Sequence, residues 1–129
     1  GQGPARLLQT IPTHGAHGAA LLWTRQGGAL LLAVANFGDR LGKKHEARST
    51  FYRWRPEARG GLGQFEKLHE VETLGATDFE GMHVGPLDLF AVSNEGGPGG
   101  AATDSVFYRV LESCPPDSDP PDSLAHSDL

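Results

Sequence analysis

The sequence predicts an all-β fold built from two similar units, and three observations lead to this expectation. The first is an internal repeat, because STFYR at residues 49–53 returns as SVFYR at residues 105–109. The second is the composition, since 18 glycines and 9 prolines are scattered between short apolar runs, as in chains of many turns and short strands. The third is the length of those runs, the longest of which, residues 29–35, is strand-sized.

The repeat has three landmarks that return in the same order. Besides the strand motif above, TIPTHGA at residues 10–16 returns as EVETLGA at 70–76, and LLLAVAN at 30–36 returns as DLFAVSN at 88–94. The copies are offset by 60, 58 and 56 residues, so the length differences lie in the connections between landmarks. Repeats of this period indicate stacked supersecondary units, which mostly build binding surfaces.

Each unit is expected to contain four strands joined by turns. In the first unit these are residues 5–12, 19–24, 29–36 and 49–55, and in the second 65–73, 79–84, 87–94 and 105–112. The third strand is the clearest, because ALLLAVA is apolar at every position, as in a strand covered on both faces. The flanking Gly28 and Gly38 leave too little room for a helix. The fourth strand alternates, with Phe51 and Arg53 on one face.

The predicted domain organisation is one repeat over residues 6–58, a second over 62–112, and a tail over 113–129. The tail is rich in Pro, Asp and Ser without apolar periodicity, so it is expected to be disordered. It contains Cys114, the one cysteine of the chain, which has either a partner outside this segment or no structural role.

Charge and motifs exclude several function classes. The net charge of −5 argues against nucleic acid as a partner. No apolar run approaches the roughly 20 residues that span a bilayer, and no signal peptide is visible at the start. A G-x-S-x-G elbow is missing, and RGGLGQ at residues 59–64 lacks the lysine of a phosphate loop. His14 and His17 lie in a glycine turn rather than on a helix. The chain is therefore expected not to be an enzyme and to need no cofactor.

Two groups of charged residues are candidate sites. Asp78, Glu80 and Asp88 supply carboxylates of the kind that hold calcium, although no D-x-D-x-D-G loop is present and turn capping explains them as well. The connection between the third and fourth strands of the first unit is basic, and it is expected to meet an acidic partner such as a protein or a sulfated glycan through Arg40, Lys43, Lys44 and Arg48. In the second unit a glycine loop replaces it. If a partner surface exists, these two connections (37–48 and 95–103) are its expected place, since repeated residues build scaffold.

The landmarks resemble the epilepsy-associated repeat, also called the EAR or EPTP repeat. The first unit has Q-x-I-x-T-x-G-A, L-A-V-A-N and S-x-F-Y-R-W, and the second has T-x-G-A, the acid–aromatic pair at 78–79 and SVFYR. The resemblance covers about residues 6–112. Two positions depart from it: His17 and Gly18 stand in place of the acid–aromatic pair, and Val110 stands where the first unit has Trp54.

The resemblance implies a β-propeller of about seven four-stranded blades. It also implies secretion or display at the cell surface, and protein–protein recognition in adhesion or signalling rather than catalysis. The chain is more similar to the adhesion-receptor and laminin-G-linked EAR proteins than to the synaptic members with leucine-rich repeats.

Two blades cannot close a propeller. The chain is therefore expected either to belong to a longer propeller, which we favour, or to form a ring of several copies. Three rival interpretations remain: a carbohydrate-binding β-sandwich, a propeller enzyme with polar residues near the axis, and a diverged product without a stable fold.

Overall fold

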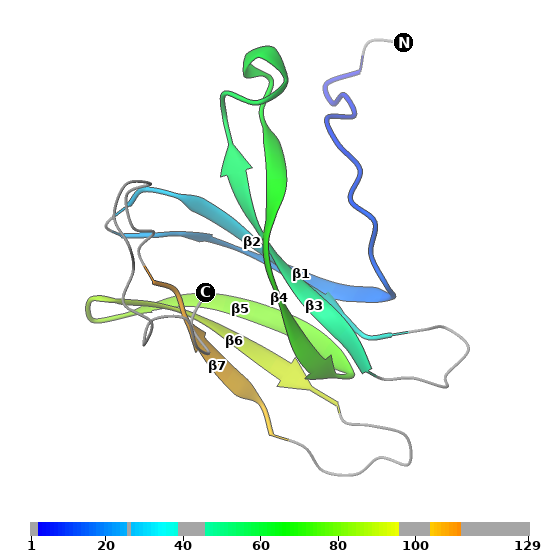
Figure 1. Cartoon of the computed structure of the whole chain (residues 1–129), viewed down its shortest axis with the longest axis vertical. Helices are drawn as coiled ribbons and strands as arrows, with labels where there is room; N and C mark the ends of the chain where they lie inside the picture. Colours follow the sequence, from blue (N-terminus) through cyan, green and yellow to red (C-terminus); the bar gives the residue numbers. More distant parts are fainter. Residues whose placement is uncertain (1–2, 26, 39–45, 96–103, 112–129) are drawn as a thin grey trace.

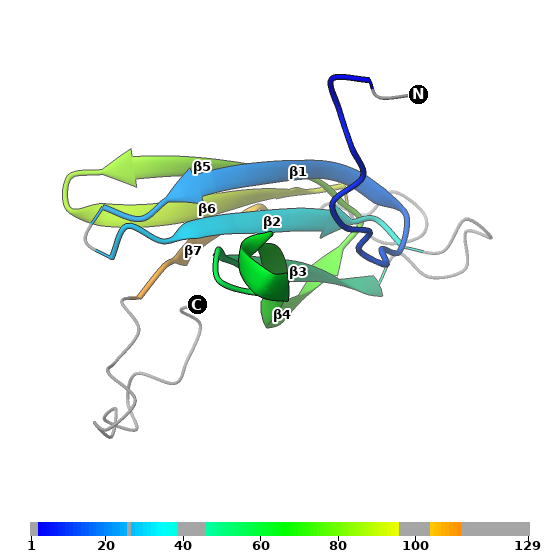
Figure 2. The same cartoon turned by 90° about the horizontal axis from the view of Figure 1, so that it is seen from above.

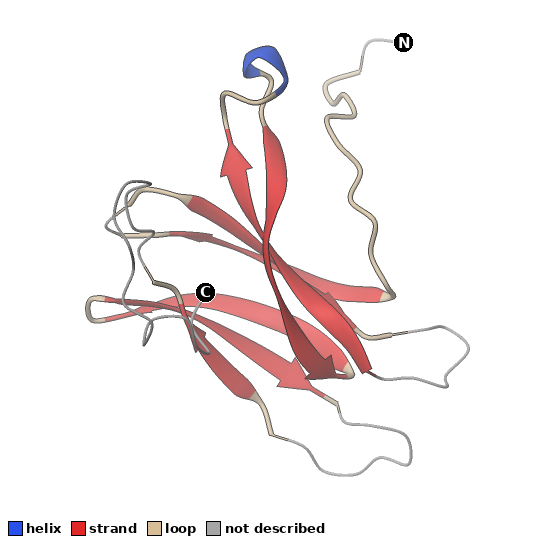
Figure 3. Ribbon diagram, in the orientation of Figure 1, coloured by secondary structure: helices blue, strands red, loops and turns tan. Residues whose placement is uncertain are grey.

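The predicted all-β class is confirmed. The computed structural model describes residues 3–25, 27–38, 46–95 and 104–111, and in these residues strands dominate (Figure 3). The elements in chain order are β1 (Ala16–Trp23), β2 (Leu30–Asn36), β3 (Glu46–Arg55), a 3-10 turn (Arg59–Gly61), β4 (Gln64–Leu74), β5 (Ala76–Val84), β6 (Leu87–Asn94) and β7 (Val106–Arg109). The predicted tail 113–129 and most of the two connections 37–48 and 95–103 lie outside the described residues.

The strands form two antiparallel sheets, and each sheet is a simple meander. The first sheet has the order β1-β2-β3-β4, and the second has the order β5-β6-β7 (Figure 1). The repeat is visible in the register as well. Ala16 pairs with Asn36 in the first sheet as Ala76 pairs with Asn94 in the second, and both hairpins have a bulge at the following residue.

One expectation about the sheets is wrong: the units of sequence repeat are not the sheets. Residues 65–73, expected to begin the second sheet, belong to β4, which pairs with β3 and completes the first sheet. The reason is the turn before it. Gly60 and Gly63 adopt positive φ, which only glycine does without strain, and the chain reverses tightly enough for β4 to lie along β3. As sequence units, 6–58 and 62–112 stay a prediction.

A second expectation is also wrong, because residues 5–12 form no strand. By the offset of 60 they correspond to residues 65–72 of β4, so their partner would be the last strand of a preceding sheet. Among the described residues no such sheet exists. An extended segment without a neighbour has no ladder to pair its backbone groups, so the strand does not form.

The core lies between the two sheets and centres on Phe51 of β3, which is 0% exposed. Its ring packs edge-on against Phe79 of β5 and Tyr108 of β7, with ring centroids 5.3 and 5.8 Å apart, and against the tilted ring of Phe90 at 5.4 Å. Such aromatic pairs stabilise by more than the area they bury. The aliphatic residues of β1 and β2 that share this face include Leu22, Leu31 and Ala33.

The sheets approach each other most closely along β1 and β5, which lie side by side in Figure 2. Two glycines permit this approach. A Cβ atom at Gly81 would lie 3.1 Å from the carbonyl oxygen of Leu21, and one at Gly18 would overlap the side chain of Asp78. Adjacent sheets that converge along their first strands have the wedge geometry of radially arranged blades, so the arrangement is consistent with propeller-blade-like repeats.

Candidate interaction surface

The repeated polar residues form a buried cluster at one end of the first sheet. The side chain of Asn36 donates a hydrogen bond from Nδ2 to the carbonyl oxygen of Arg48 (2.8 Å) and accepts one at Oδ1 from the backbone N–H of His14 (3.1 Å). Its backbone N–H donates to Ser49 Oγ, which also bonds Thr73 Oγ1 at 2.8 Å. The motifs T-x-G-A, L-A-V-A-N and S-x-F-Y-R therefore meet in space, and they join three strands and the start of β1.

The second sheet contains an incomplete version of this cluster. Asn94 Nδ2 donates to the carbonyl oxygen of Asp104 at 3.0 Å, as Asn36 does to Arg48. However, Asn94 Oδ1 is buried and lacks a hydrogen-bond partner within the part of the chain that the structure describes. Ser105, which corresponds to the buried Ser49, is exposed. The repeated residues are thus scaffold in the first sheet and partly unpaired in the second.

This difference gives a matched pair of variants. We expect Asn36→Ala to lower the free energy of unfolding by about 1–3 kcal/mol, because it removes a buried side chain and leaves the part-buried carbonyl of Arg48 and N–H of His14 without their partners. Asn94→Ala removes a single hydrogen bond that is exposed to solvent, so it should cost less. Urea denaturation of both variants measures the difference. An equal loss for both would show that the cluster does not stabilise the first sheet.

Of the four basic residues predicted to contact a partner, the structure describes only Arg48. Its side chain is 60% exposed and lies 3.5 Å from the Glu72 carboxylate of β4. Arg40, Lys43 and Lys44 lie outside the described residues. The two connections start at the ends of β2 and β6, and these ends lie on the same side of the molecule (Figure 1).

Strand β4 carries alternating charges beside Arg48. Lys67 Nζ lies 2.5 Å from Glu70 Oε1, and Arg55 Nε lies 3.1 Å from Glu66 Oε2. The hydrogen bond from Lys67 holds the pKa of the half-buried Glu70 side chain below its usual range. Charged side chains on the last strand of a sheet oppose uncontrolled pairing with other sheets, so β4 has the character of a protected edge.

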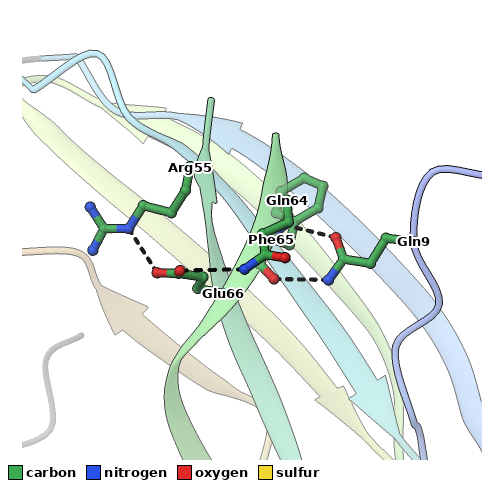
Figure 4. A network of polar contacts seen from close by, with 5 residues as sticks. All are labelled: Gln9, Arg55, Gln64, Phe65 and Glu66. Atoms are coloured by element: carbon green, nitrogen blue, oxygen red, sulfur yellow. Dashed lines mark hydrogen bonds and ion pairs between the residues drawn. The ribbon is translucent and has the colours of Figure 1, made fainter. Parts of the chain in front are cut away.

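The N-terminal segment runs beside β4 and is held by side chains (Figure 4). The side-chain amide of Gln9 forms two hydrogen bonds with the backbone of Phe65. Its Nε2 donates to the carbonyl oxygen (2.9 Å), and its Oε1 accepts from the N–H (2.8 Å). Arg59 donates to the carbonyl oxygen of Leu8. Sequence reasoning missed this role of Gln9, because a lone glutamine in an apolar stretch carries no signal of its own.

Exposed apolar side chains lie on the outer faces of both sheets, as a pair in β1 and as a single residue in β7. On the first sheet, Leu21 and Trp23 of β1 are each 60% exposed. On the second, Phe107 of β7 is 65% exposed although its counterpart Phe51 is the most central residue of the core. Isolated apolar residues on a surface are ordinary, whereas grouped ones mark association sites. The sequence repeat predicts the same burial for Phe107 as for Phe51, and it could not reveal this difference in exposure.

The three carboxylates considered for calcium do not come together as a ligand set. Asp88 accepts hydrogen bonds from the backbone N–H of Arg25 (3.1 Å) and contacts His83 Nδ1 at 2.6 Å, so it ties two turns to each other. Asp78 Oδ1 accepts from the N–H of Phe79. Within the described ranges there is no group of three or more potential metal ligands.

A search of the described residues for a helix that could cross a membrane finds none that is long and apolar enough.

Comparison with known proteins points to one relative. No family model matches the chain, and no solved structure gives a significant match. The chain is 33% identical over 106 residues to the human thrombospondin-type laminin G domain and EAR repeat-containing protein. The match covers 81% of the chain but only 15% of that relative's length. This similarity indicates a relationship to EAR-repeat proteins, in agreement with the motifs of the two repeats.

Proposed function

We propose that this chain is a pair of EAR repeats from a propeller and that it serves protein–protein recognition without catalysis. The single observation that carries the proposal is the similarity to the EAR repeat-containing protein over 81% of the chain. The wedge of two antiparallel sheets agrees with it. The described polar clusters also agree, because the hydrogen bonds of Asn36, Ser49 and Asp88 tie strands and turns together.

The proposed setting is outside the cell, where the chain contributes to adhesion or receptor recognition. The relative's name combines the EAR repeat with a thrombospondin-type laminin G domain, a combination that favours an extracellular protein. Since the chain spans about 15% of that relative, the partners of a whole protein of this kind are likewise a proposal. The partner we propose is an extracellular or cell-surface protein.

The proposed contact surface is the side of the molecule where β2 and β6 end. Loops on a rigid scaffold vary without disturbing the fold and therefore carry specificity. Arg48 begins the described part of this surface, and Arg40, Lys43 and Lys44 belong to the adjoining connection. Four basic side chains between residues 40 and 48 favour an acidic patch on the partner.

The test is binding of the fluorescently labelled chain to cultured cells before and after two treatments. Trypsin removes surface proteins and heparinase removes sulfated glycans. We expect binding to be lost after trypsin and kept after heparinase. Loss after heparinase alone would favour the carbohydrate-binding alternative, and no saturable binding at all would contradict the proposal.

Charge reversal of the basic connection tests the surface itself. We expect replacement of Arg40, Lys43, Lys44 and Arg48 by Glu to weaken cell binding by about tenfold or more, since several rim charges of modest individual effect act together. A control variant reverses four basic residues elsewhere, namely Arg25, Arg55, Arg59 and Lys67. Equal weakening by both variants would mean that net charge, not this surface, determines binding.

A further inference from the structure

The second sheet has an open edge at β7. Within the described chain β7 pairs with β6 on one side only, whereas β3, its counterpart, pairs with β2 on one side and β4 on the other. The consequence is visible in burial: Ser49 of β3, which bonds Thr73 of β4, is 0% exposed, while Ser105, directly before β7, is exposed. An unpaired edge of this kind is a template for another strand.

The chain also contains a segment that corresponds to the missing strand. Residues 5–13 align with residues 65–73 of β4 at the offset of 60, with Thr13 in the place of Thr73. The segment runs without a turn, and Leu7 is 83% exposed. Side-chain contacts hold it beside the first sheet. The side chain of Gln9 bonds the backbone of Phe65, which leaves the backbone N–H and C=O of Gln9 out of these bonds, and Arg59 donates to the carbonyl oxygen of Leu8.

We propose that the β7 edge is completed by residues 5–13 of a second copy of this chain. Strand β7 of one copy and residues 5–13 of the other run antiparallel. The first sheet of the donor copy packs on the outer face of the second sheet of the acceptor copy. This inference rests on the repeat geometry and not on which partner protein the module recognises. It goes beyond the possibility of a ring by naming the donor segment, the acceptor edge and their register.

The formed pair β3–β4 sets the register of the proposed pair. Ser49 lies opposite Val71, Phe51 opposite His69 and Arg53 opposite Glu66. Each β3 residue corresponds to the β7 residue 56 positions later, and each β4 residue corresponds to the N-terminal residue 60 positions earlier. In the proposed pair, Ser105 therefore lies opposite Ile11, Phe107 opposite Gln9 and Arg109 opposite Arg6. The same correspondence places the hydroxyl of Thr13 beside that of Ser105, as the hydroxyls of Thr73 and Ser49 are bonded in the first sheet.

The exposed apolar side chains of β1 and β7 match this arrangement. Phe107 stands where Phe51 meets the rings of the following sheet, so it points to the face on which a further sheet would pack. The patch of Leu21 and Trp23 on the first sheet is on the opposite side of the pair. Because donor and acceptor are different surfaces, the contact is heterologous and repeats from copy to copy until it closes a ring.

Disulfide trapping tests the register directly. All chains carry Cys114→Ser, so the sole thiol of each is an introduced one. One chain carries Ile11→Cys and the other Ser105→Cys, and they are mixed, which makes every heterodimeric link intermolecular. We expect a covalent dimer under mild oxidation, because directly opposed residues bring their Cβ atoms within disulfide range. The matched control is Thr10→Cys with Ser105→Cys, whose side chains leave opposite faces of the sheet.

A charge cycle at Arg6 and Arg109 gives a second readout with substitutions at the surface. The register opposes two like charges, so Arg109→Glu alone, or Arg6→Glu alone, should tighten self-association by roughly two- to tenfold in sedimentation equilibrium at low salt. The double variant Arg6→Glu with Arg109→Glu should return to the original affinity.

The outcomes separate this proposal from the proposed function. Trapping by Ile11→Cys above the Thr10→Cys control, together with the charge cycle, establishes the strand exchange even if no partner protein is found. A chain that stays monomeric at every concentration, equal trapping by both cysteine pairs, or additive charge effects would overturn it. Cell binding by the unmodified chain would be unaffected by that result.

Discussion

Phe51→Ala should lower the free energy of unfolding by about 3–5 kcal/mol, the largest loss expected from any single truncation in this chain. The ring is fully buried and contacts three other aromatic rings, which come from β5, β6 and β7. Its removal leaves a cavity at the junction of both sheets, because aromatic neighbours on three strands cannot all move inward. Thermal and urea unfolding, followed by circular dichroism, measure the loss.

The repeat supplies the control for this experiment. Phe107 occupies the equivalent position in β7 but is 65% exposed, so Phe107→Ala should change the stability of the dilute chain by less than about 1 kcal/mol. At high concentration it should reduce self-association instead. If the two truncations cost the same, the core does not lie where the structure places it.

Val34→Asp should prevent folding altogether. Val34 lies in the middle of β2, is 7% exposed, and pairs with Ala19 of β1 and Thr50 of β3. A carboxylate there would project from the sheet among the side chains of its cross-strand neighbours, and the cost of desolvating an unpaired charge is several kcal/mol. That is comparable with the whole stability of a small domain. We expect the variant to show no cooperative transition and a random-coil spectrum.

Val84→Asp is the matched substitution for that test. Val84 ends β5 beside the turn at Gly85 and is 50% exposed, so the carboxylate remains hydrated and the fold should persist. A folded Val34→Asp variant would show that β2 is not covered on both faces, against both the sequence pattern and the structure.

Much of the fold follows from the sequence, because strand-forming patterns are local. The run LLLAVAN predicts a doubly covered strand, and β2 is buried or half-buried throughout. The turns at Gly28 and Gly85 predict the two hairpins, and both residues adopt positive φ. The repeat landmarks predict equivalent elements, and their registers agree between the sheets.

The candidate site was less accessible to sequence reasoning. The structure shows Arg48 exposed, but neither a charge run nor exposure reveals a partner, so the binding role of the four basic residues stays a prediction. The polar cluster around Asn36 was visible only as repeated letters. Those letters show that the positions are equivalent, yet not that their side chains meet.

The sequence by itself determined the all-β class, most of the strand patterns and the equivalence of the two repeats, since each follows from residue types along the chain without knowledge of which segments meet in space. Only the tertiary structure decided which strands share a sheet. Residues 65–73 pair with the strand before them and complete the first sheet, while the equivalent residues 5–12 form no ladder with any described strand and are held by side-chain hydrogen bonds instead. The physical reason is that a β-strand is stabilised by the hydrogen bonds and side-chain contacts of its neighbours. Two segments of equivalent sequence therefore differ in structure when only one of them has a strand to pair with.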